Sequence, residues 1–282
     1  MKRLPSTVRE FLPEPVVSLV RPLYHVLWRG SLKLDWWIHD RFKTAKSAQT
    51  IPPARLRFRV GECNEIGVFQ AVGEQTAKKI QNALSEAGYP LEDFRSVLDF
   101  GCGCGRTLVW LCRAFPGIKW HGTDVDAEAI EWCRENIVGG TFTMNGEAPP
   151  LGYRDETFDF IYAISVFTHL NGDAQRAWAQ ELRRIVKRGG IVLLTIHSEF
   201  TWKNLGEAEA VEREGYVFRT SGKLRGILPE WYHTAFQTKE YTIGILSEHF
   251  EILKHFSNGG GEQDIFVVRR ARLDDASHIA MP

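Results

Sequence analysis

The chain has 282 residues, of which 44% are hydrophobic and 25% are charged, and its formal net charge is zero. This composition is ordinary for a globular protein and argues against a disordered chain, which would be poorer in apolar residues. The apolar stretches 16–20 and 22–28 are separated by Arg21 and fall short of the ~18 apolar residues that a membrane span requires. The length suits one large domain with an extension, or two small domains.

Charge is distributed unevenly along the chain. Residues 1–60 contain twelve Lys or Arg against four Asp or Glu, a net charge of +8, so the rest of the chain carries −8. This asymmetry separates a basic, Trp-rich N-terminal extension (1–60) from an acidic body. An acidic body argues against a nucleic-acid partner, which favours a basic surface.

The extension is expected to be partly helical. Its first part is predicted to fall into short pieces, because proline stops a helix from propagating; the prolines are Pro5, Pro13, Pro15 and Pro22. Residues 23–42 are amphipathic at helical spacing. The residues expected on one side of this helix are Trp28, Leu32, Trp36 and Ile38. Residues 51–58, with Pro52 and Pro53, are expected to form a linker.

Two interpretations of the extension stay open. Residues 1–50 could contact an anionic membrane surface peripherally, as amphipathic basic helices do. Alternatively, the extension packs on the body or on a second subunit, since tryptophan is at least as common in buried contacts. We favour packing, and the oligomeric state is left open.

The body (61–270) shows strands alternating with helices. Apolar runs predict five strands at 95–101, 118–124, 141–145, 157–167 and 191–197. Helical patterns occupy 68–84, 106–114, 127–136, 173–186 and 239–249, with a less regular insertion over 198–238. Two further strands, 250–256 and 264–270, flank a glycine-rich turn and predict a closing antiparallel hairpin. Residues 271–282 are expected to be a flexible tail.

This order of elements predicts an α/β fold. Alternating strands and helices form a parallel sheet with helices on both faces, and the hairpin adds one antiparallel strand. The expected architecture is a Rossmann-like, seven-stranded, mostly parallel sheet preceded by a helical N-terminal extension. In such sheets, ligands bind at the carboxyl ends of the strands.

The loop after the first body strand is rich in glycine. Asp99 precedes Gly101, Gly103 and Gly105 in the sequence "DFGCGCGR". Glycine allows positive φ and a close approach of the backbone to a ligand, and a following helix N-terminus favours polar or anionic groups. The dinucleotide fingerprint G-x-G-x-x-G would need a third glycine where Arg106 stands, so an NAD-dependent oxidoreductase is disfavoured.

The D-x-G-x-G-x-G pattern resembles the first motif of class I S-adenosylmethionine-dependent methyltransferases. The resemblance, of the bacterial small-molecule type, spans roughly 95–270. It implies that the loop glycines lie against the methionine part and the adenosine side of the cofactor S-adenosylmethionine, and that Asp99 positions its amino end.

The ends of the next two strands extend this resemblance. Asp124 ends the second strand, about 20 residues after the loop, where a carboxylate can accept two ribose hydroxyl hydrogen bonds. Asp126 stands at a helix start and is expected to be an N-cap. Asn145, after the third strand, matches the position of the family's adenine contact only loosely, because an aspartate is commoner there.

The five cysteines do not predict a metal site or a disulfide framework. Zinc needs four ligands, usually as two C-x₂₋₄-C pairs, and Cys102-x-Cys104 has no second pair among Cys63, Cys112 and Cys133. An odd cysteine count without a signal peptide predicts a reduced, cytoplasmic protein.

Two histidines are the candidate catalytic residues. His169 follows the fourth strand and His197 ends the fifth, and both ends should face one crevice. Histidine titrates near neutrality and can take a proton from an acceptor. For both residues a purely structural role is the alternative. Trp231, Tyr232 and His233 could belong to a lid over the acceptor or to the core.

The sequence therefore predicts an S-adenosylmethionine-dependent methyltransferase acting on O or N of a small-molecule, sugar-like or lipid-like acceptor. The [DNS]-P-P-[YFW] motif of amino-methylating enzymes and the Pro-Cys of cytosine-C5 enzymes are both absent. Two alternatives are a membrane-peripheral lipid or quinone methyltransferase and a non-catalytic cofactor-binding subunit.

Overall fold

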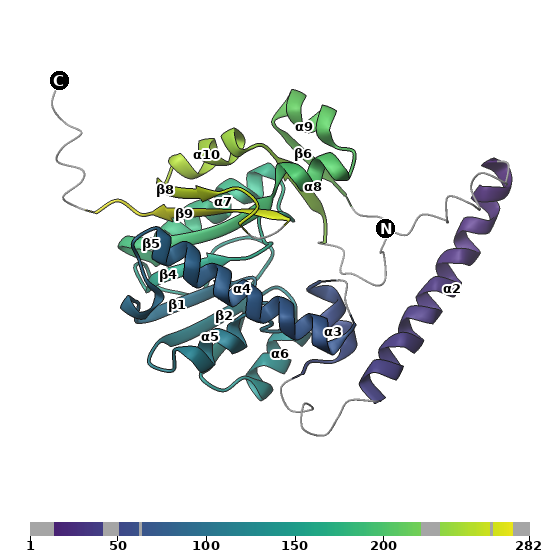
Figure 1. The fold of residues 1–282 in the computed structure, drawn as a ribbon, viewed down its shortest axis with the longest axis horizontal. Helices are drawn as coiled ribbons and strands as arrows, with labels where there is room; N and C mark the ends of the chain where they lie inside the picture. Colours follow the sequence, from purple (N-terminus) through teal and green to yellow (C-terminus); the bar gives the residue numbers. More distant parts are fainter. Residues whose placement is uncertain (1–13, 42–50, 62–63, 221–231, 260–261, 273–282) are drawn as a thin grey trace.

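The computed structural model describes residues 14–41, 51–61, 64–220, 232–259 and 262–272, with the side chains of 14–26 and 29 excepted. Within them lies a seven-stranded sheet of order β3-β2-β1-β4-β5-β9-β8 (Figure 1). All neighbouring strands from β3 to β5 pair in parallel, and β9 is antiparallel to both β5 and β8. The strands are β1 (Ser96–Phe100), β2 (Lys119–Asp124), β3 (Gly140–Met144), β4 (Phe158–Ala163), β5 (Val186–His197), β8 (Glu251–Phe256) and β9 (Gln263–Arg269). The predicted mostly parallel sheet with one antiparallel closing strand is confirmed.

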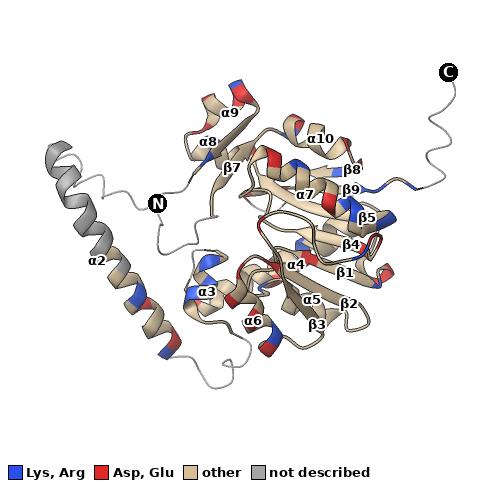
Figure 2. Cartoon of the chain, turned by 180° about the vertical axis from the view of Figure 1, so that it is seen from behind, with Lys and Arg blue, Asp and Glu red and all other residues tan. Residues whose placement is uncertain are grey.

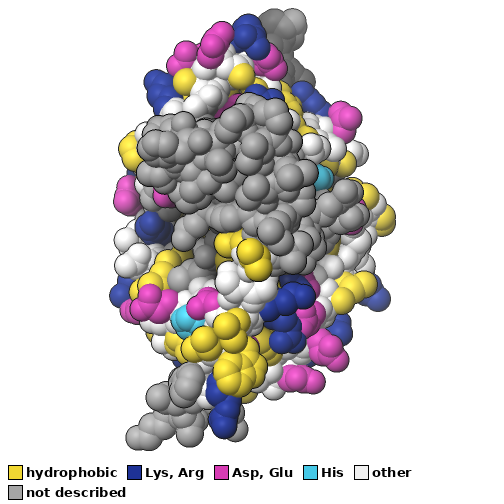
Figure 3. Space-filling model, turned by 90° about the vertical axis from the view of Figure 1, so that its right-hand side faces the viewer, with side chains coloured by type: hydrophobic (Ala, Val, Ile, Leu, Met, Phe, Trp, Pro, Cys, Tyr) yellow, Lys and Arg dark blue, Asp and Glu magenta, His cyan; other side chains and the backbone are white. Residues whose placement is uncertain are grey.

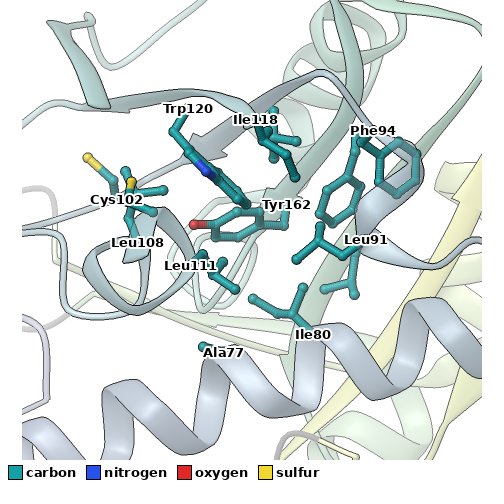
Figure 4. Packing of buried hydrophobic residues seen from close by; sticks show 14 of the residues in the cluster. Ala77, Ile80, Leu91, Phe94, Cys102, Leu108, Leu111, Ile118, Trp120 and Tyr162 are labelled. Carbon is teal, nitrogen blue, oxygen red and sulfur yellow. The ribbon is translucent and has the colours of Figure 1, made fainter. Parts of the chain in front are cut away.

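Helices cover both faces of this sheet (Figure 1). On one face, buried residues of the helices α4 to α6 pack with β1, β2, β4, β5 and β9; Figure 4 shows Ile80 and Leu111 of these helices close to Tyr162 of the sheet. On the other face, α7 and α10 pack against β1, β4, β5 and β9. Alternate strand residues point to opposite faces, which is why the central strands are apolar throughout. The helices are α4 (Ile66–Glu86), α5 (Leu108–Ala114), α6 (Ala127–Asn136), α7 (Gly172–Ile185) and α10 (Lys239–Ser247), with a 3-10 helix at Leu91–Asp93.

The extension differs from its prediction in three respects. Helix α2 (Glu14–Arg41) is continuous through Pro22, so the predicted break there is wrong; Pro15 lies in the first turn, where the missing N–H costs nothing. Ile38 is 40% exposed and does not share the partly buried side of Trp28, Leu32 and Trp36. At 100° per residue, Ile38 lies about 80° or more from those three around the helix.

The predicted linker 51–58 is also wrong. Pro53 caps the short helix α3 (Ala54–Arg59), whose Leu56 and Phe58 are buried. Leu56 packs with Phe69 and the loop residue Cys104. Proline just before a helix is favourable because its φ suits the first turn, so the Pro-Pro pair starts a packed helix.

The insertion 198–238 is more ordered than expected. Helices α8 (Glu199–Asn204) and α9 (Ala208–Glu214) pack with an antiparallel pair of strands, β6 (Tyr216–Arg219) and β7 (Thr234–Gln237). Their buried residues form a small core. Elements of four to seven residues contain too few periods to give a clear hydrophobic pattern. Trp231 and most of the predicted tail lie outside the described residues.

Two element boundaries differ from the prediction. Strand β4 ends at Ala163 rather than at Phe167, so 164–171 form a loop. Residues 187–190, which directly follow the predicted helix 173–186, belong to β5. Val186 pairs with Phe158 and Ile191 with Phe160, so the four residues between them form an irregularity in the β4–β5 pairing.

Candidate functional site

A cavity of about 1070 Å³ opens at the carboxyl ends of β1, β2, β4 and β5. Parallel strands bring residues that are distant in sequence to this one edge. The predicted residues that line it are Asp99, Gly101, Gly103, Asp124, Asn145, His169 and His197. One continuous cavity therefore joins the glycine loop to both histidines.

The glycine loop needs glycine for conformation and for space. Gly101, Gly103 and Gly105 have φ of 78°, 52° and 72°, the left-handed region that other residues rarely adopt. A Cβ on Gly103 would lie 2.5 Å from Cγ1 of Val60. Gly105 does not line the cavity; a Cβ there would lie 2.2 Å from Cδ1 of Ile137, so its position is explained by packing beneath the loop.

Asp99 is a buried acid at the end of β1. Its Oδ2 accepts a hydrogen bond from the Tyr162 hydroxyl, at 2.9 Å. Burial raises the pKa of Asp99 to about 8 and the charge of Asp124 adds to this rise, whereas the Tyr162 hydrogen bond and the charge of Arg106 oppose it. A cationic or hydrogen-bond-donating ligand in the cavity would therefore stabilise the ionised form.

Asp124 is held by the backbone. Its Oδ2 accepts from the Gly103 N–H at 2.7 Å and its Oδ1 from the Asp126 N–H at 2.9 Å. Burial raises the pKa of this carboxyl, and the same backbone hydrogen bonds oppose the rise. Each carboxylate oxygen has a second lone pair, so Asp124 can still accept hydrogen bonds from a ligand in the cavity.

Asp126 caps α6, as predicted, by accepting from the Ala129 N–H. It also forms an ion pair with Arg59 at 2.8 Å, and Arg59 contacts Glu128 at 2.9 Å. Figure 2 shows the basic helix α3 beside the acidic start of α6. These contacts fix the residues after α3 as one wall of the cavity, which Arg59, Val60 and Gly61 line.

Asn145 follows β3 at the rim of the cavity. Its Oδ1 accepts from the Thr123 hydroxyl at 2.8 Å, and its Nδ2 donates to the Gly146 carbonyl at 2.7 Å. The side chain is thereby oriented by its neighbours. The cofactor contact predicted for Asn145 stays a prediction.

His169 is fixed in one orientation. Its Nδ1 lies 2.6 Å from the carbonyl oxygen of His233, and because a carbonyl only accepts, Nδ1 carries the hydrogen. Its ring lies 4.3 Å from that of Tyr232, centroid to centroid. Burial lowers the pKa of His169. The neutral ring then has its lone pair on Nε2.

His197 lies in the same cavity at the end of β5. Burial lowers its pKa to about 4, and the nearby His169 contributes. Its buried Nδ1 has no hydrogen-bond partner among the described residues, so it could bind a polar group of a ligand. The structure thus brings the two predicted histidines together, both neutral at pH 7.

The sequence does not identify several residues of this cavity. Arg59 and Val60 belong to the predicted extension and Gly61 begins the predicted body, although the alternation of basic residues with Phe58 indicates packing. Ser165 (φ 61°) and Gln263 were also missed: the Gln263 amide donates to the Ser165 hydroxyl at 2.8 Å across 98 residues of sequence. No sequence pattern near either residue predicts this contact.

The cysteines of the loop are packing residues. Cys102, Cys104, Cys112 and Cys133 are buried thiols. Burial raises the pKa of the Cys112 thiol to about 12. Within the described ranges, no group of three His, Cys, Asp or Glu side chains is placed to hold a metal ion, and no helix there is long and apolar enough to cross a bilayer. The cytoplasmic location stays a prediction.

Comparisons with known proteins agree with this geometry. Residues 97–190 match the family model described as a methyltransferase domain. The chain is 35% identical over 101 residues to the tRNA (carboxymethyluridine(34)-5-O)-methyltransferase of Arabidopsis thaliana, covering 36% of this chain and 23% of that protein. It is 31% identical over 103 residues to the fatty-acid O-methyltransferase of Mycolicibacterium smegmatis, covering 36% of each. The chain thus spans about a quarter to a third of these two relatives.

Among solved structures, the fold resembles magnesium protoporphyrin IX methyltransferase from Synechocystis PCC 6803 with bound SAH. The TM-score is 0.53 at 19% identity, and the match covers 83% of this chain and 98% of that chain. An S-adenosylmethionine-dependent methyltransferase from Methanosarcina mazei gives a TM-score of 0.50 at 19% identity, covering 66% and 96%. At such identities the likeness shows the fold alone.

Proposed function

The chain belongs to the class I S-adenosylmethionine-dependent methyltransferases, and on that premise we propose that it transfers a methyl group from S-adenosylmethionine to an oxygen or nitrogen atom of a small acceptor. The observation that carries the proposal is the single cavity that joins Asp99 and Asp124 to His169 and His197. The residues that would bind the methyl donor and the histidine that would accept a proton therefore line the same cavity.

The residues of the cavity fit this cofactor. Burial raises the pKa of both Asp99 and Asp124, and the charge of Asp124 raises that of Asp99 further. A positively charged amino group and two ribose hydroxyls would stabilise the ionised carboxylates. The loop backbone at Gly101 and Gly103 has no side chain to bar a close approach. Asp99, the loop glycines and Asp124 would hold the cofactor, and Asn145 would contact its base.

When bound, S-adenosylmethionine supplies an activated methyl group on a positively charged sulfur. The chain's own task is to orient the acceptor and, where needed, to remove its proton. Nε2 of His169 would take that proton, because Nδ1 donates its hydrogen to the His233 carbonyl. His197, whose pKa is lowered by burial to about 4, would hydrogen-bond the acceptor as a neutral ring.

The acceptor is proposed to be a small-molecule, sugar-like or lipid-like compound. Two relatives support this range: one is named for a fatty acid, and another for phthiotriol and phenolphthiotriol dimycocerosates. The cavity combines polar groups at the histidines with apolar residues, among them Leu170, Phe218 and Trp178. Such a lining suits an amphiphilic ligand with few hydrogen-bonding groups.

Calorimetry with S-adenosylmethionine, followed by incubation with isotope-labelled cofactor and separate aqueous and lipid extracts, tests the proposal. We expect saturable binding and labelled product in one extract, and neither with Asp124→Ala. A folded chain that does not bind the cofactor would overturn the assignment. Binding without any labelled product would favour a non-catalytic subunit.

A further inference from the structure

We infer that the outer face of helix α2 binds the surface of an anionic lipid bilayer. The outer face consists of Leu27, Leu34, Trp37 and Ile38, which are 65%, 57%, 61% and 40% exposed. At 3.6 residues per turn, these four side chains fall within an arc of about 100°. Among the described side chains of α2, these four are the large hydrophobic ones that are exposed.

The opposite side of α2 contacts the body. The ring of Trp36 lies 5.6 Å from that of Phe58, centroid to centroid. Asp40 accepts a hydrogen bond from the Ala54 N–H at 2.9 Å, and Asp35 accepts one from the Asn64 amide. Helix α2 is thereby fixed to α3 with its outer face turned away from the body.

The charged residues of this part of α2 differ in their contacts. Asp35 and Asp40 make the contacts with the body just described. Arg41 is exposed within the arc of the outer face, and Lys33 is exposed about 40° beyond its edge. Figure 3 looks onto the side of the molecule where α2 lies and shows hydrophobic side chains there, with Lys and Arg as well as Asp and Glu side chains nearby. Among residues 27–41, the one charged residue within the arc is therefore Arg41, with Lys33 beside its edge.

Exposed apolar side chains together with positive charge favour an anionic lipid surface as the partner. Lipid headgroups of negative charge attract lysine and arginine, and Trp and Leu insert at the boundary between headgroups and acyl chains. The sequence of residues 1–60 adds to this attraction with its net charge of +8. A second copy of the chain fits less well, because a two-fold contact uses the same surface of both copies and would bring two segments of net positive charge together.

Flotation of the full-length chain with vesicles tests the inference. We expect binding to phosphatidylcholine vesicles that contain phosphatidylglycerol, little binding to phosphatidylcholine alone, and weakening by high salt. The double variant Leu34→Ser/Trp37→Ser should lose about tenfold in binding, since it removes most of the inserted apolar area. The matched control Val138→Ser/Met144→Ser removes two apolar residues that are 93% and 59% exposed elsewhere, and should float like the unmodified chain.

A second pair of variants tests the role of charge. Lys33→Glu/Arg41→Glu should lower binding about tenfold, whereas Arg113→Glu/Lys119→Glu, exposed on another surface, should lower it far less. All variants should keep their affinity for S-adenosylmethionine, so a failure of the inference is distinguishable from a failure of the proposed function.

Three results would overturn the inference. The first is an unmodified chain that does not float with the anionic vesicles. The second is a Leu34→Ser/Trp37→Ser variant that floats as well as the unmodified chain. The third is an unmodified chain that sediments as a dimer and a Leu34→Ser/Trp37→Ser variant that sediments as a monomer, with neither protein binding vesicles. The outer face would then be an interface between copies.

Discussion

The two halves of the cavity are connected over different distances along the chain. In the cofactor half, defined by Asp99, the loop 101–105 and Asp124, the Gly103 N–H bonds to a carboxylate 21 residues later. In the acceptor half, defined by His169, His197, Tyr232 and His233, His169 bonds to a carbonyl 64 residues later. A supporting hydrogen bond from Gln263 to Ser165 spans 98 residues.

This difference has a physical consequence. The cofactor half is one strand–loop–helix unit and its neighbouring strand, so backbone turns and parallel pairing are enough to form it. The acceptor half needs the folded insertion, including β6 and β7, before its groups meet. Substitutions in the cofactor half should therefore affect cofactor affinity, and those in the acceptor half should affect turnover.

The largest effect on cofactor affinity is expected for Gly103→Val. The new side chain would start 2.5 Å from Val60 in a φ of 52°, so the loop must shift, and the affinity for S-adenosylmethionine in calorimetry should fall more than about 100-fold. Gly88→Ala is the control, because Gly88 shares a positive φ of 84° but has no neighbouring atom within 4 Å. Equal losses in the two variants would contradict a specific role of the loop.

His169→Gln tests the acceptor half. Loss of the oriented imidazole should lower kcat by about 10²–10⁴-fold and leave the cofactor affinity within about twofold, measured by methyl transfer and calorimetry. His249→Gln, which changes a histidine outside the cavity, should leave kcat unchanged. An unchanged kcat in His169→Gln would assign His169 a structural role.

The buried neutral state of His197 predicts a pH dependence of stability. Its pKa is lowered from 6.5 to about 4. Between pH 6.5 and pH 4, His197 therefore binds a proton in the unfolded chain but not in the folded chain. Stability should therefore fall as pH drops from 6.5 to 4, by up to about 3 kcal/mol from this group. The free energy of unfolding, measured in urea at several pH values, should fall less in His197→Asn than in the unmodified chain. The same pH dependence in both proteins would contradict a buried, neutral His197.

Comparing Asp124→Asn with Asp126→Asn tests which of these two neighbouring acids binds the cofactor. The amide keeps one acceptor oxygen and places its NH₂ against a backbone N–H, so the affinity for S-adenosylmethionine should fall about 10–100-fold. In Asp126→Asn the asparagine still caps α6, and the loss should stay below about threefold. A larger loss for Asp126→Asn would make Asp126 the ribose partner.

The smallest effect is expected for Arg59→Gln. This change removes ion pairs to Asp126 and Glu128 that orient the wall formed by residues 59–61, and partly exposed pairs contribute up to about 1 kcal/mol. Cofactor affinity should fall about two- to threefold. Lys78→Gln, which removes an exposed ion pair with Glu74 on α4, should have no effect on it.

The sequence by itself determined the features that depend on local geometry. The hydrophobic runs predicted the order of strands and helices, Asp126 the start of α6, and the alternating glycines a loop with positive φ, because each arises from neighbours within a few residues. The closing hairpin was equally readable from two apolar runs around a glycine-rich turn.

Only the tertiary structure decided which distant residues meet. It placed α3 as a wall of the cavity, turned Ile38 outward, and fixed the tautomer of His169 through the His233 carbonyl. These outcomes depend on long-range packing of short elements, whose individual patterns are too brief to predict. The cofactor half could be predicted because its contacts follow from consecutive elements. In the acceptor half, only His169 and His197 could be predicted, from the ends of two neighbouring parallel strands. The contact of His169 with His233 forms only when the insertion folds.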